Sequence, residues 1–344
     1  MVPRSWVSRA CLLLVPIVAT GCALVSDSDP ESSSSSSESP SHSEAGGQAF
    51  PVTIDHKFGS TTITEKPVRV VTVGLNEQDA LLALGVVPVG TTHWFGDEPG
   101  DIFPWARDAL GDAPVPKVLD SEQEFESVAA LEPDLIVAMY AGISKDDYRL
   151  LSQIAPTLAQ PKGYVNYGVP WQETTRTVGL ALGQADEADK LVDDVEALIA
   201  SQRDAHPEFA GSTAVVATLY EGIFVYGPED PRGRLLTDLG FTFPEELTDV
   251  GQDEFGGSIS VENADLVDVD SLVWISAKQA VEKAVPQYGN LDVAKQGRDV
   301  FIDEDDPRYA ATSFVTVLSL PYLLEDLVPR LEAAVDADVT TETS

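Results

Sequence analysis

Apolar and polar positions follow two distinct rhythms along the first half of the chain. Residues 68–74 and 135–139 are short runs rich in aliphatic residues, which is typical of strands buried on both faces of a sheet. Residues 76–84 carry apolar side chains at helical spacing, and Gly85 ends that stretch. This order of strand and helix indicates a parallel sheet covered by helices. The same half also predicts a strand at 86–90 and helices at 127–131 and 145–154.

The second half repeats this order of elements without repeating the sequence. A helix is predicted at 233–239, where Gly240 ends the apolar spacing. A closing helix is predicted at 313–335, and Pro321 and Pro329 are expected to kink or restart it. The predicted strands of this half cover 213–219, 224–226, 272–275 and 300–302.

The longest helical pattern lies between the two halves. A first segment covers 171–182 and is interrupted at Gly183, after which Asp186 is the predicted N-cap of a second segment. Apolar side chains then recur at helical spacing as far as Ile199, and the pattern ends near Pro207. A helix of about twenty residues spans about 30 Å. The pattern therefore predicts a stiff connector between two lobes; the alternative is a core helix of one large domain.

The predicted fold class is α/β, with two Rossmann-like lobes that are built on central sheets and joined by a single long rigid helix. The N-terminal lobe is expected to cover residues 50–170 and the C-terminal lobe residues 207–337, with the helical segment at 171–206 between them. Residues 338–344 are expected to form a disordered tail.

The N-terminal 22 residues have the order of a membrane-targeting segment. Arg4 and Arg9 precede an apolar run at 12–18 that is too short to span a bilayer, and small residues follow. The ending Ala-Thr-Gly-Cys resembles a bacterial lipobox, in which the cysteine is acylated and becomes the first residue. We therefore expect a lipoprotein signal peptide at 1–22 and lipidation of Cys22. An ordinary secretory signal with a chance cysteine is the alternative.

Residues 23–49 predict a tether behind this anchor. They combine six consecutive serines with acids, prolines and glycines, so they have almost nothing to bury and should stay disordered. A flexible coil of this length reaches roughly 28 Å. Cys22 would be the one cysteine left after removal of the signal peptide, so no intramolecular disulfide is expected.

The charge of the chain limits its partners. The formal net charge is −36, and removal of residues 1–22 takes away two arginines and no acids, so it becomes −38. A field of this sign disfavours nucleic acid and anionic lipid surfaces as partners. An anionic ligand would need locally clustered arginine or lysine.

Motifs of common enzyme classes are absent from the sequence. There is no GxSxG, Walker A, GxGxxG or CxxC pattern, and nothing pairs a nucleophile with a base. The four histidines, at positions 42, 56, 93 and 206, are scattered, so a histidine-rich site for zinc or manganese is not expected. These absences weaken the case for an enzyme without excluding it, and no cofactor and no protein-held metal are expected.

Aromatic and cationic residues follow several predicted strands, at the edge where ligands bind in open α/β sheets. Arg232 lies near a helix N-terminus, where a cation is unfavourable unless an anion is nearby, so an anionic ligand is one interpretation. Arg308 has a local ion pair as its alternative, Lys162 has solvation, and Trp171 has a role as an anchor at a helix start. The predicted ligand-binding residues are Trp94, Tyr140, Lys162, Trp171, Tyr226, Arg232 and Arg308.

Several stretches of the chain match one known family. They include Leu-Gly-Val-Val-Pro-Val-Gly at 84–90, Ala-Leu-Glu-Pro-Asp-Leu-Ile at 130–136 and Leu-Ser-Leu-Pro-Tyr at 318–322. On these stretches the chain resembles the substrate-binding lipoproteins of iron–siderophore ABC importers, of the ferric-enterobactin and ferrichrome type. The resemblance covers roughly residues 50–335, and further matches lie at 66–71, 151–157 and 226–241.

The resemblance implies a class III periplasmic-binding-protein fold with a ligand cleft between the lobes and a small movement on closure. It implies a ferric siderophore as ligand, whose iron is held by the chelator, and an ABC transporter permease as partner. In relatives one acid per lobe docks on the permease, and Glu126 and Glu262 match those positions. The protein is expected to be a monomer, held by its lipid on the extracytoplasmic face of the cell membrane.

Several alternatives stay open at this point. A protein of the same fold could bind cobalamin or haem instead. An extracytoplasmic hydrolase and a structural or signalling lipoprotein are alternatives from other classes. The sequence does not distinguish a catecholate chelate from a hydroxamate or a mixed one.

Overall fold

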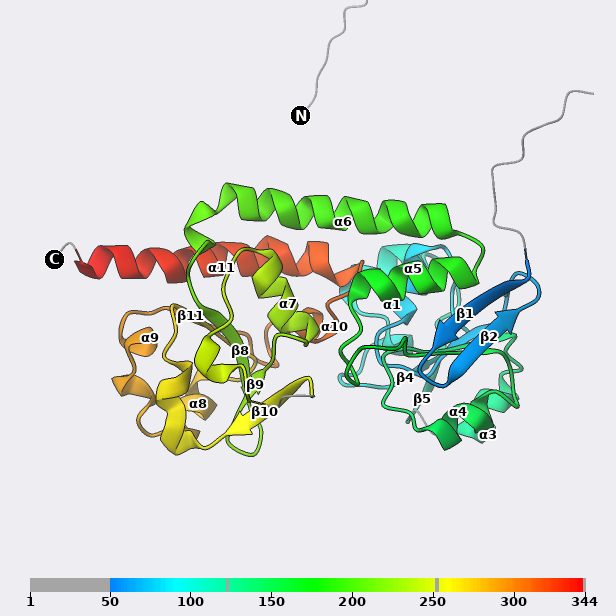
Figure 1. Ribbon diagram of the computed structural model, residues 1–344, viewed down its shortest axis with the longest axis horizontal. Helices are drawn as coiled ribbons and strands as arrows, with labels where there is room; N and C mark the ends of the chain where they lie inside the picture. Colours follow the sequence, from blue (N-terminus) through cyan, green and yellow to red (C-terminus); the bar gives the residue numbers. More distant parts are fainter. Residues whose placement is uncertain (1–49, 122–123, 251–253, 343–344) are drawn as a thin grey trace, which may run out of the picture. The chain divides into compact units, whose positions relative to one another are not determined.

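The computed structural model describes residues 50–121, 124–250 and 254–342. They fall in one compact unit, and within it two sheets each form the centre of a lobe (Figure 1). The predicted signal peptide at 1–22, the tether at 23–49 and Cys22 lie outside the described residues. Two α/β lobes with central sheets confirm the predicted fold class.

The first lobe is built on a five-stranded parallel sheet. Its central strands are aliphatic and fully buried because helices cover both faces. Helix α4 (Lys145–Leu151) begins with a capping box, in which the side chains of Ser144 and Asp147 each accept a hydrogen bond from the other's backbone N–H. In sheet order the strands are β5 (Lys117–Leu119), β4 (Gly90–Thr92), β3 (Val70–Thr72), β6 (Leu135–Ala138) and β7 (Thr157–Ala159). The helices are α1 (Gln78–Ala83), α2 (Arg107–Leu110), α3 (Phe125–Ala130) and α4 (Lys145–Leu151).

An antiparallel hairpin precedes this sheet and was not predicted. It pairs β1 (Val52–His56) with β2 (Gly59–Ile63), and Val52 faces Ile63 across the pair. Side chains of β1 alternate between buried and exposed, as expected of a strand that covers a core with one face. The hairpin packs over the first-lobe core, which includes Val70 and Leu135.

The second lobe has a mixed sheet where a parallel one was expected. Strands β8, β11 and β12 are parallel, whereas β9 and β10 run antiparallel to their neighbours. The reversal occurs at Glu221 and Gly222, whose φ angles of 48° and 117° form a tight hairpin turn. In sheet order the strands are β10 (Gly256–Ile259), β9 (Ile223–Tyr226), β8 (Ala214–Leu219), β11 (Ser271–Trp274) and β12 (Asp299–Phe301), with helices α7 (Pro231–Asp238), α8 (Lys278–Ala284) and α9 (Asp292–Lys295).

Two helices in succession carry the chain from the first lobe to the second. Helix α5 (Trp171–Ala181) packs on the first lobe, and α6 (Ala185–Ala205) continues beside α11 (Ser319–Glu342) (Figure 1). One stripe of α6 contacts both cores, because Ala188 belongs to the first-lobe cluster and Val192 to the second. Gln184, not Asp186, is the N-cap residue; Asp186 lies in the first turn, since the chain turns at Gly183 and the helix restarts at once.

The predicted closing helix consists of two helices. Helix α10 (Tyr309–Phe314) ends at Val315, which is left-handed with a φ of 45°, and α11 (Ser319–Glu342) follows. Pro321 lies in the first turn of α11, where a missing N–H costs little, so it marks a restart of the helix. Helix α11 runs past the predicted end at residue 335, because nothing after Pro329 interrupts it.

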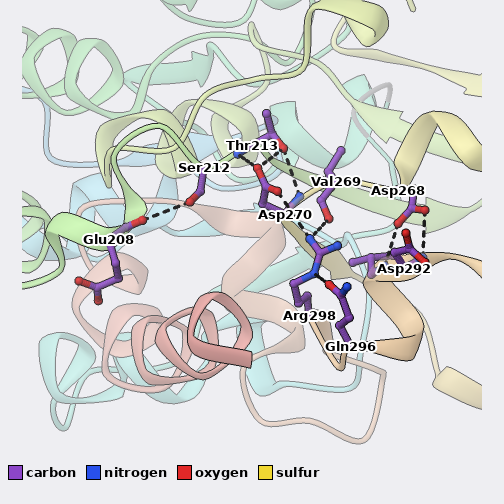
Figure 2. A network of polar contacts seen from close by, with 10 residues as sticks. Glu208, Ser212, Thr213, Asp268, Val269, Asp270, Asp292, Gln296 and Arg298 are labelled. Atoms are coloured by element: carbon purple, nitrogen blue, oxygen red, sulfur yellow. Dashed lines mark hydrogen bonds and ion pairs between the residues drawn. The ribbon is translucent and has the colours of Figure 1, made fainter. Parts of the chain in front are cut away.

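A polar network fixes the strand starts of the second lobe (Figure 2). The buried Arg298 donates to the carbonyl of Val269 at 2.6 Å and lies 3.7 Å from Asp270. Asp270 in turn accepts bonds from the backbone N–H and the hydroxyl of Thr213, at 2.7 and 2.8 Å. These residues directly precede β12, β11 and β8, so the network holds the amino edge of the sheet.

Short 3-10 segments complete the described structure. They cover Pro99–Asp101, Pro104–Ala106, Pro207–Phe209, Glu245–Leu247, Val261–Val267 and Tyr288–Asn290.

Candidate functional site

Aromatic rings of the first lobe gather after the carboxyl ends of its strands. Trp94 and Phe95 follow β4, and Tyr140 follows β6. The ring of Trp94 lies 6.0 Å from that of Tyr140, which lies 5.4 Å from that of Tyr167. The structure therefore brings together Trp94 and Tyr140, two of the residues that the sequence predicted as ligand-binding.

These rings meet rings of the second lobe. Trp94 lies 5.4 Å from Phe314, Phe95 lies 5.8 Å from Tyr309, and Tyr167 lies 6.0 Å from Phe255, measured between ring centroids. The series continues through Phe224 to Tyr226. We call this set the aromatic belt; its members are Trp94, Phe95, Tyr140, Tyr167, Phe224, Tyr226, Phe255, Tyr309 and Phe314.

Buried carboxylates fix the first-lobe part of the belt. Glu77 accepts backbone bonds from Met139 and Tyr140, both at 2.7 Å, and so fixes the turn that presents the Tyr140 ring. Burial raises the pKa of Glu77 to about 7, although these N–H groups favour its charged form. Asp101 likewise fixes the loop after β4 that carries Trp94, since it accepts the backbone N–H of Trp94 at 3.1 Å.

Gly142 allows the rings of this lobe to come close. A Cβ atom at this position would lie 2.5 Å from the hydroxyl oxygen of Tyr167. Tyr140 is only 2% exposed, and burial raises the pKa of its phenol. The Tyr140 ring is therefore almost fully buried within the belt, and its phenol stays uncharged.

Arg232 is paired within the protein. It donates to Asp230 through Nε and Nη2, both at 2.7 Å, and its guanidinium lies over the Tyr226 ring at 3.8 Å. Asp230 is fully buried and also caps α7 by accepting the backbone N–H of Arg232 at 2.8 Å. Burial opposes the charge of Arg232, but the Asp230 carboxylate raises its pKa overall. The anion near this helix start is thus Asp230, and the cation there does not in itself indicate an anionic ligand.

Of the three other predicted ligand residues, Arg308 and Trp171 have structural contacts and Lys162 is exposed. Arg308 lies over the Tyr322 ring at 3.6 Å and is 3.8 Å from Glu325, so its ion-pair partner is an acid of a distant helix and not one of the acids that precede it. Trp171 is buried at the start of α5 in the second-lobe core, as the anchor alternative expected. Lys162 is exposed, and its charge, together with the larger effect of burial, lowers the pKa of His56. None of these contacts is with the belt.

A cavity of about 490 Å³ adjoins the belt, and we call it the inter-lobe cavity. Residues 95–98, 103 and 104 of the first lobe line one side, and residues 304, 306, 307, 309 and 310 of the second lobe line the other. Phe95 and Tyr309 belong to both the belt and the cavity wall. A second cavity, of about 340 Å³, lies between α5, α6 and α7.

The two predicted docking acids are both exposed. Glu126 lies in the first turn of α3, and Glu262 lies in the first turn of the segment Val261–Val267. Each lobe therefore presents one such carboxylate to solvent. Among the described residues neither has an ion-pair partner.

One group of described residues could hold a metal ion. His206, Glu208 and Glu332 place ligand atoms within 4.8 Å of one another, where the end of α6 meets α11. His206 already bonds Glu208 at 2.8 Å. In the part of the chain that the structure describes, no helix is both long and apolar enough to cross a bilayer.

Sequence reasoning missed part of the belt. Phe95 and Tyr309 follow predicted strands, and Tyr167 lies in the loop before the predicted helical segment at 171–206, but none of the three was chosen. The alternation of Phe224 and Tyr226 along one strand was a usable signal, because residues two apart share a face. Phe255 and Phe314 had no local signal, since only the tertiary fold brings them to the other rings.

Comparison with known proteins gives a consistent result. Residues 70–315 match the family described as periplasmic binding protein. The probable siderophore-binding lipoprotein YfiY of Bacillus subtilis is 30% identical over 295 residues, which cover 80% of this chain and 86% of that protein.

Two solved structures show the same fold. The periplasmic solute binding protein of Mycobacterium smegmatis is 35% identical, with a TM-score of 0.73, over 83% of this chain and 99% of that one. PiaA of Streptococcus pneumoniae, solved in complex with ferrichrome, is 30% identical, with a TM-score of 0.73 and the same coverage.

Proposed function

The chain belongs to the periplasmic binding protein family, and on that premise we propose that it captures a ferric siderophore between its lobes for an ABC importer. The aromatic belt is the observation that carries this proposal, because it runs from one lobe into the other. The name of YfiY and the ferrichrome bound to PiaA support the same ligand class. The family itself confirms the resemblance drawn from the sequence.

The chemistry of the belt suits a chelated iron. Such a ligand is large and rigid, and its outer surface is organic, so ring faces can pack on it over a wide area. The iron would keep the donors of its chelator, so no protein ligand to the metal is required. Phenols of Tyr226 and Tyr309 could donate hydrogen bonds to carbonyl or phenolate oxygens of the chelate.

Membrane attachment and delivery complete the proposal. Lipidation of Cys22 would anchor the protein on the extracytoplasmic face, with residues 23–49 as a tether. Glu126 and Glu262 would meet basic residues of the permease, which favours orientation and rate of docking. Their exposure in separate lobes supports this role. The protein would act as a monomer, since each lobe supplies half of the belt.

A direct titration tests the proposed ligand. Calorimetry and tryptophan fluorescence of the mature chain with ferric hydroxamate, catecholate and mixed chelates should give a Kd below about 10 µM, roughly −7 kcal/mol. Trp94→Ala should weaken binding about tenfold, as removal of a buried anchor does. Leu150→Ala, which shortens an exposed side chain of α4, is the control and should bind normally.

The outcome separates the alternatives. If no ferric chelate binds below that limit, the proposal fails. A visible-spectrum shift with cobalamin or haem would indicate the other ligands considered for this fold. Hydrolysis of a model ester that persists through purification would instead support an enzyme.

A further inference from the structure

The strongest cation beside the belt is neutralised by the protein itself. Arg232 and Asp230 form a two-bond pair that is almost wholly buried, with 7% and 0% of their surfaces exposed. The pair contributes no net charge to the site. An anionic ligand that approached Arg232 would meet the Asp230 carboxylate with it, or would have to break a pair that is costly to separate.

The other predicted cations are also directed elsewhere. Arg308 contacts α11 through Tyr322 and Glu325. Lys162 is exposed and close enough to His56 to affect its pKa. Of the positive side chains that the sequence offered for an anionic chelate, Arg232 alone is seen over a belt ring in the described structure, and its charge is paired with Asp230.

Carboxylates line the cavity that adjoins the belt. Glu98 and Asp306 are matched by Arg107 and Arg330. Asp97 and Glu304 are exposed at the cavity, one from each lobe, and have no ion-pair partner within the described ranges. Burial raises the pKa of the Tyr309 phenol, and the negative charge of Glu304 raises it further. The surroundings of the belt are thus negative.

We propose that this site selects ferric chelates that are neutral or cationic, as trihydroxamates are, over anionic catecholate and carboxylate chelates. The inference rests on the proposed function, and it assigns the charge class of the ligand. A neutral chelate would be held by the rings, and a pendant ammonium group would lie in the inter-lobe cavity near Asp97 and Glu304. Aromatic faces beside carboxylates suit such a group, through cation–π and charge attraction.

A ranking of four probes tests this selection on the mature wild-type chain. Ferrioxamine B is the cationic probe, ferrichrome the neutral one, and ferric enterobactin and ferric citrate are the anionic ones. The first two should bind at least about tenfold more tightly than either anionic probe. Raising NaCl from about 0.05 M to about 0.5 M should weaken the cationic probe more than the neutral one, because salt screens exposed charges.

The results separate this inference from the proposed function. Equal or tighter binding of an anionic probe overturns the charge selection and leaves the proposed function standing. Failure of all four probes overturns the proposed function instead. A salt response that is identical for the cationic and neutral probes contradicts the role of the carboxylates.

Two variants locate the effect. Glu304→Gln should lower the ratio of cationic to neutral affinity about two- to fivefold, as loss of an exposed charge does. Glu282→Gln, an exposed acid of α8, is the matched control and should leave the ratio unchanged. An unchanged ratio in Glu304→Gln contradicts the proposal.

Asp230→Asn frees the charge of Arg232 and should raise the affinity for ferric enterobactin relative to ferrichrome. A relative affinity that stays the same in the folded variant contradicts the role of the pair. If this variant does not fold, the wild-type ranking and Glu304→Gln still decide.

Discussion

At the scale of single residues, the buried pair of Asp230 and Arg232 both caps a helix and positions a cation over a belt ring. Asp230 caps α7, and its bonds to Arg232 hold the guanidinium flat over Tyr226. Both charged groups are buried away from water, so each is stabilised mainly by its partner. Removing one partner should therefore be worse for folding than removing both.

A double-mutant cycle checks this dependence. Arg232→Ala and Asp230→Ala should each lower the free energy of unfolding by about 3 kcal/mol, because each leaves a buried charge unpaired. The double variant should lose less than either single variant, because it leaves no buried charge without its partner. Lys190→Ala, which breaks an exposed pair with Asp194, is the control and should cost less than about 1 kcal/mol. Additive losses in urea unfolding would show that the two charges are independent.

Asp79 provides a second test at this scale, through pH. It is buried, accepts the indole N–H of Trp105 at 2.7 Å, and accepts the hydroxyl of Thr316. Burial raises its pKa from 3.8 to about 7. Between these values the folded state binds a proton that the unfolded state has lost, so stability falls as pH rises.

The measurement is a comparison with Asp79→Asn, which keeps the shape but cannot titrate. The free energy of unfolding of the wild type, relative to this variant, should fall between pH 4 and pH 7 by an amount on the order of 4 kcal/mol and then level off. Curves that run parallel over that range would contradict the burial of a protonated carboxyl at this position.

At the scale of elements, the contact of α5 with α6 sets the angle at which the connector leaves the first lobe. Gly179 of α5 faces Ala188 of α6, and a Cβ atom at position 179 would lie 2.2 Å from the Cβ of Ala188. The absence of a side chain lets the two helices approach closely. The apolar stripe of α6 can then contact both cores.

Gly179→Ala tests this packing. The added methyl group must push α5 and α6 apart, so the free energy of unfolding should fall by about 1–3 kcal/mol, although alanine is the better helix former. Gly289→Ala is the matched control, because nothing lies within 4 Å of its Cβ position, and it should change stability by less than about 0.5 kcal/mol. Equal effects of the two substitutions in urea unfolding would contradict the close approach.

Elements with a strong local pattern were predictable from the sequence. The run at 135–139 contains a buried strand, and the apolar spacing from Ala188 onward gives α6, since both signals are periodic and local. The reversal between β8 and β9 was missed, because it depends on the φ angle of Glu221, a residue with no strong turn preference. Strands β5 and β7 have three residues each, too few to show a period.

The candidate site was predictable only in part, for a related reason. Trp94 and Tyr140 follow β4 and β6 at one edge of the first-lobe sheet, as the predicted order of strands implied, whereas Tyr226 ends the antiparallel strand β9 of the other sheet. The partner of Arg232 is two residues away, yet only the cap geometry of α7 turns Asp230 toward it. A cation that the sequence suggests as a ligand contact, such as Arg232, can therefore be paired with an acid within the protein instead.

At the scale of the whole described unit, the lobes share a core. The second-lobe cluster includes Trp171, and Ala83 and Trp105 of the first lobe pack against it. The end of α10 and the segment after it add polar links, since Asn76 donates to the carbonyl of Phe314 at 3.0 Å and Thr316 donates to Asp79. The chain thus connects the lobes both through α5 and α6 and through this returning segment, which favours a small closing movement over a wide hinge.

This shared core predicts that the lobes unfold together. Calorimetry of the wild type should show one transition, with equal calorimetric and van't Hoff enthalpies, because neither lobe can lose its packing without exposing the other's. A ferric chelate at about 100 times its Kd should stabilise the folded state by about 2.7 kcal/mol and move that single transition as a whole. Two transitions, of which the chelate moves one, would mean that the lobes fold independently and that one lobe alone carries the binding energy. The belt could not then be a joint site, since its ring contacts between the lobes would contribute nothing to affinity.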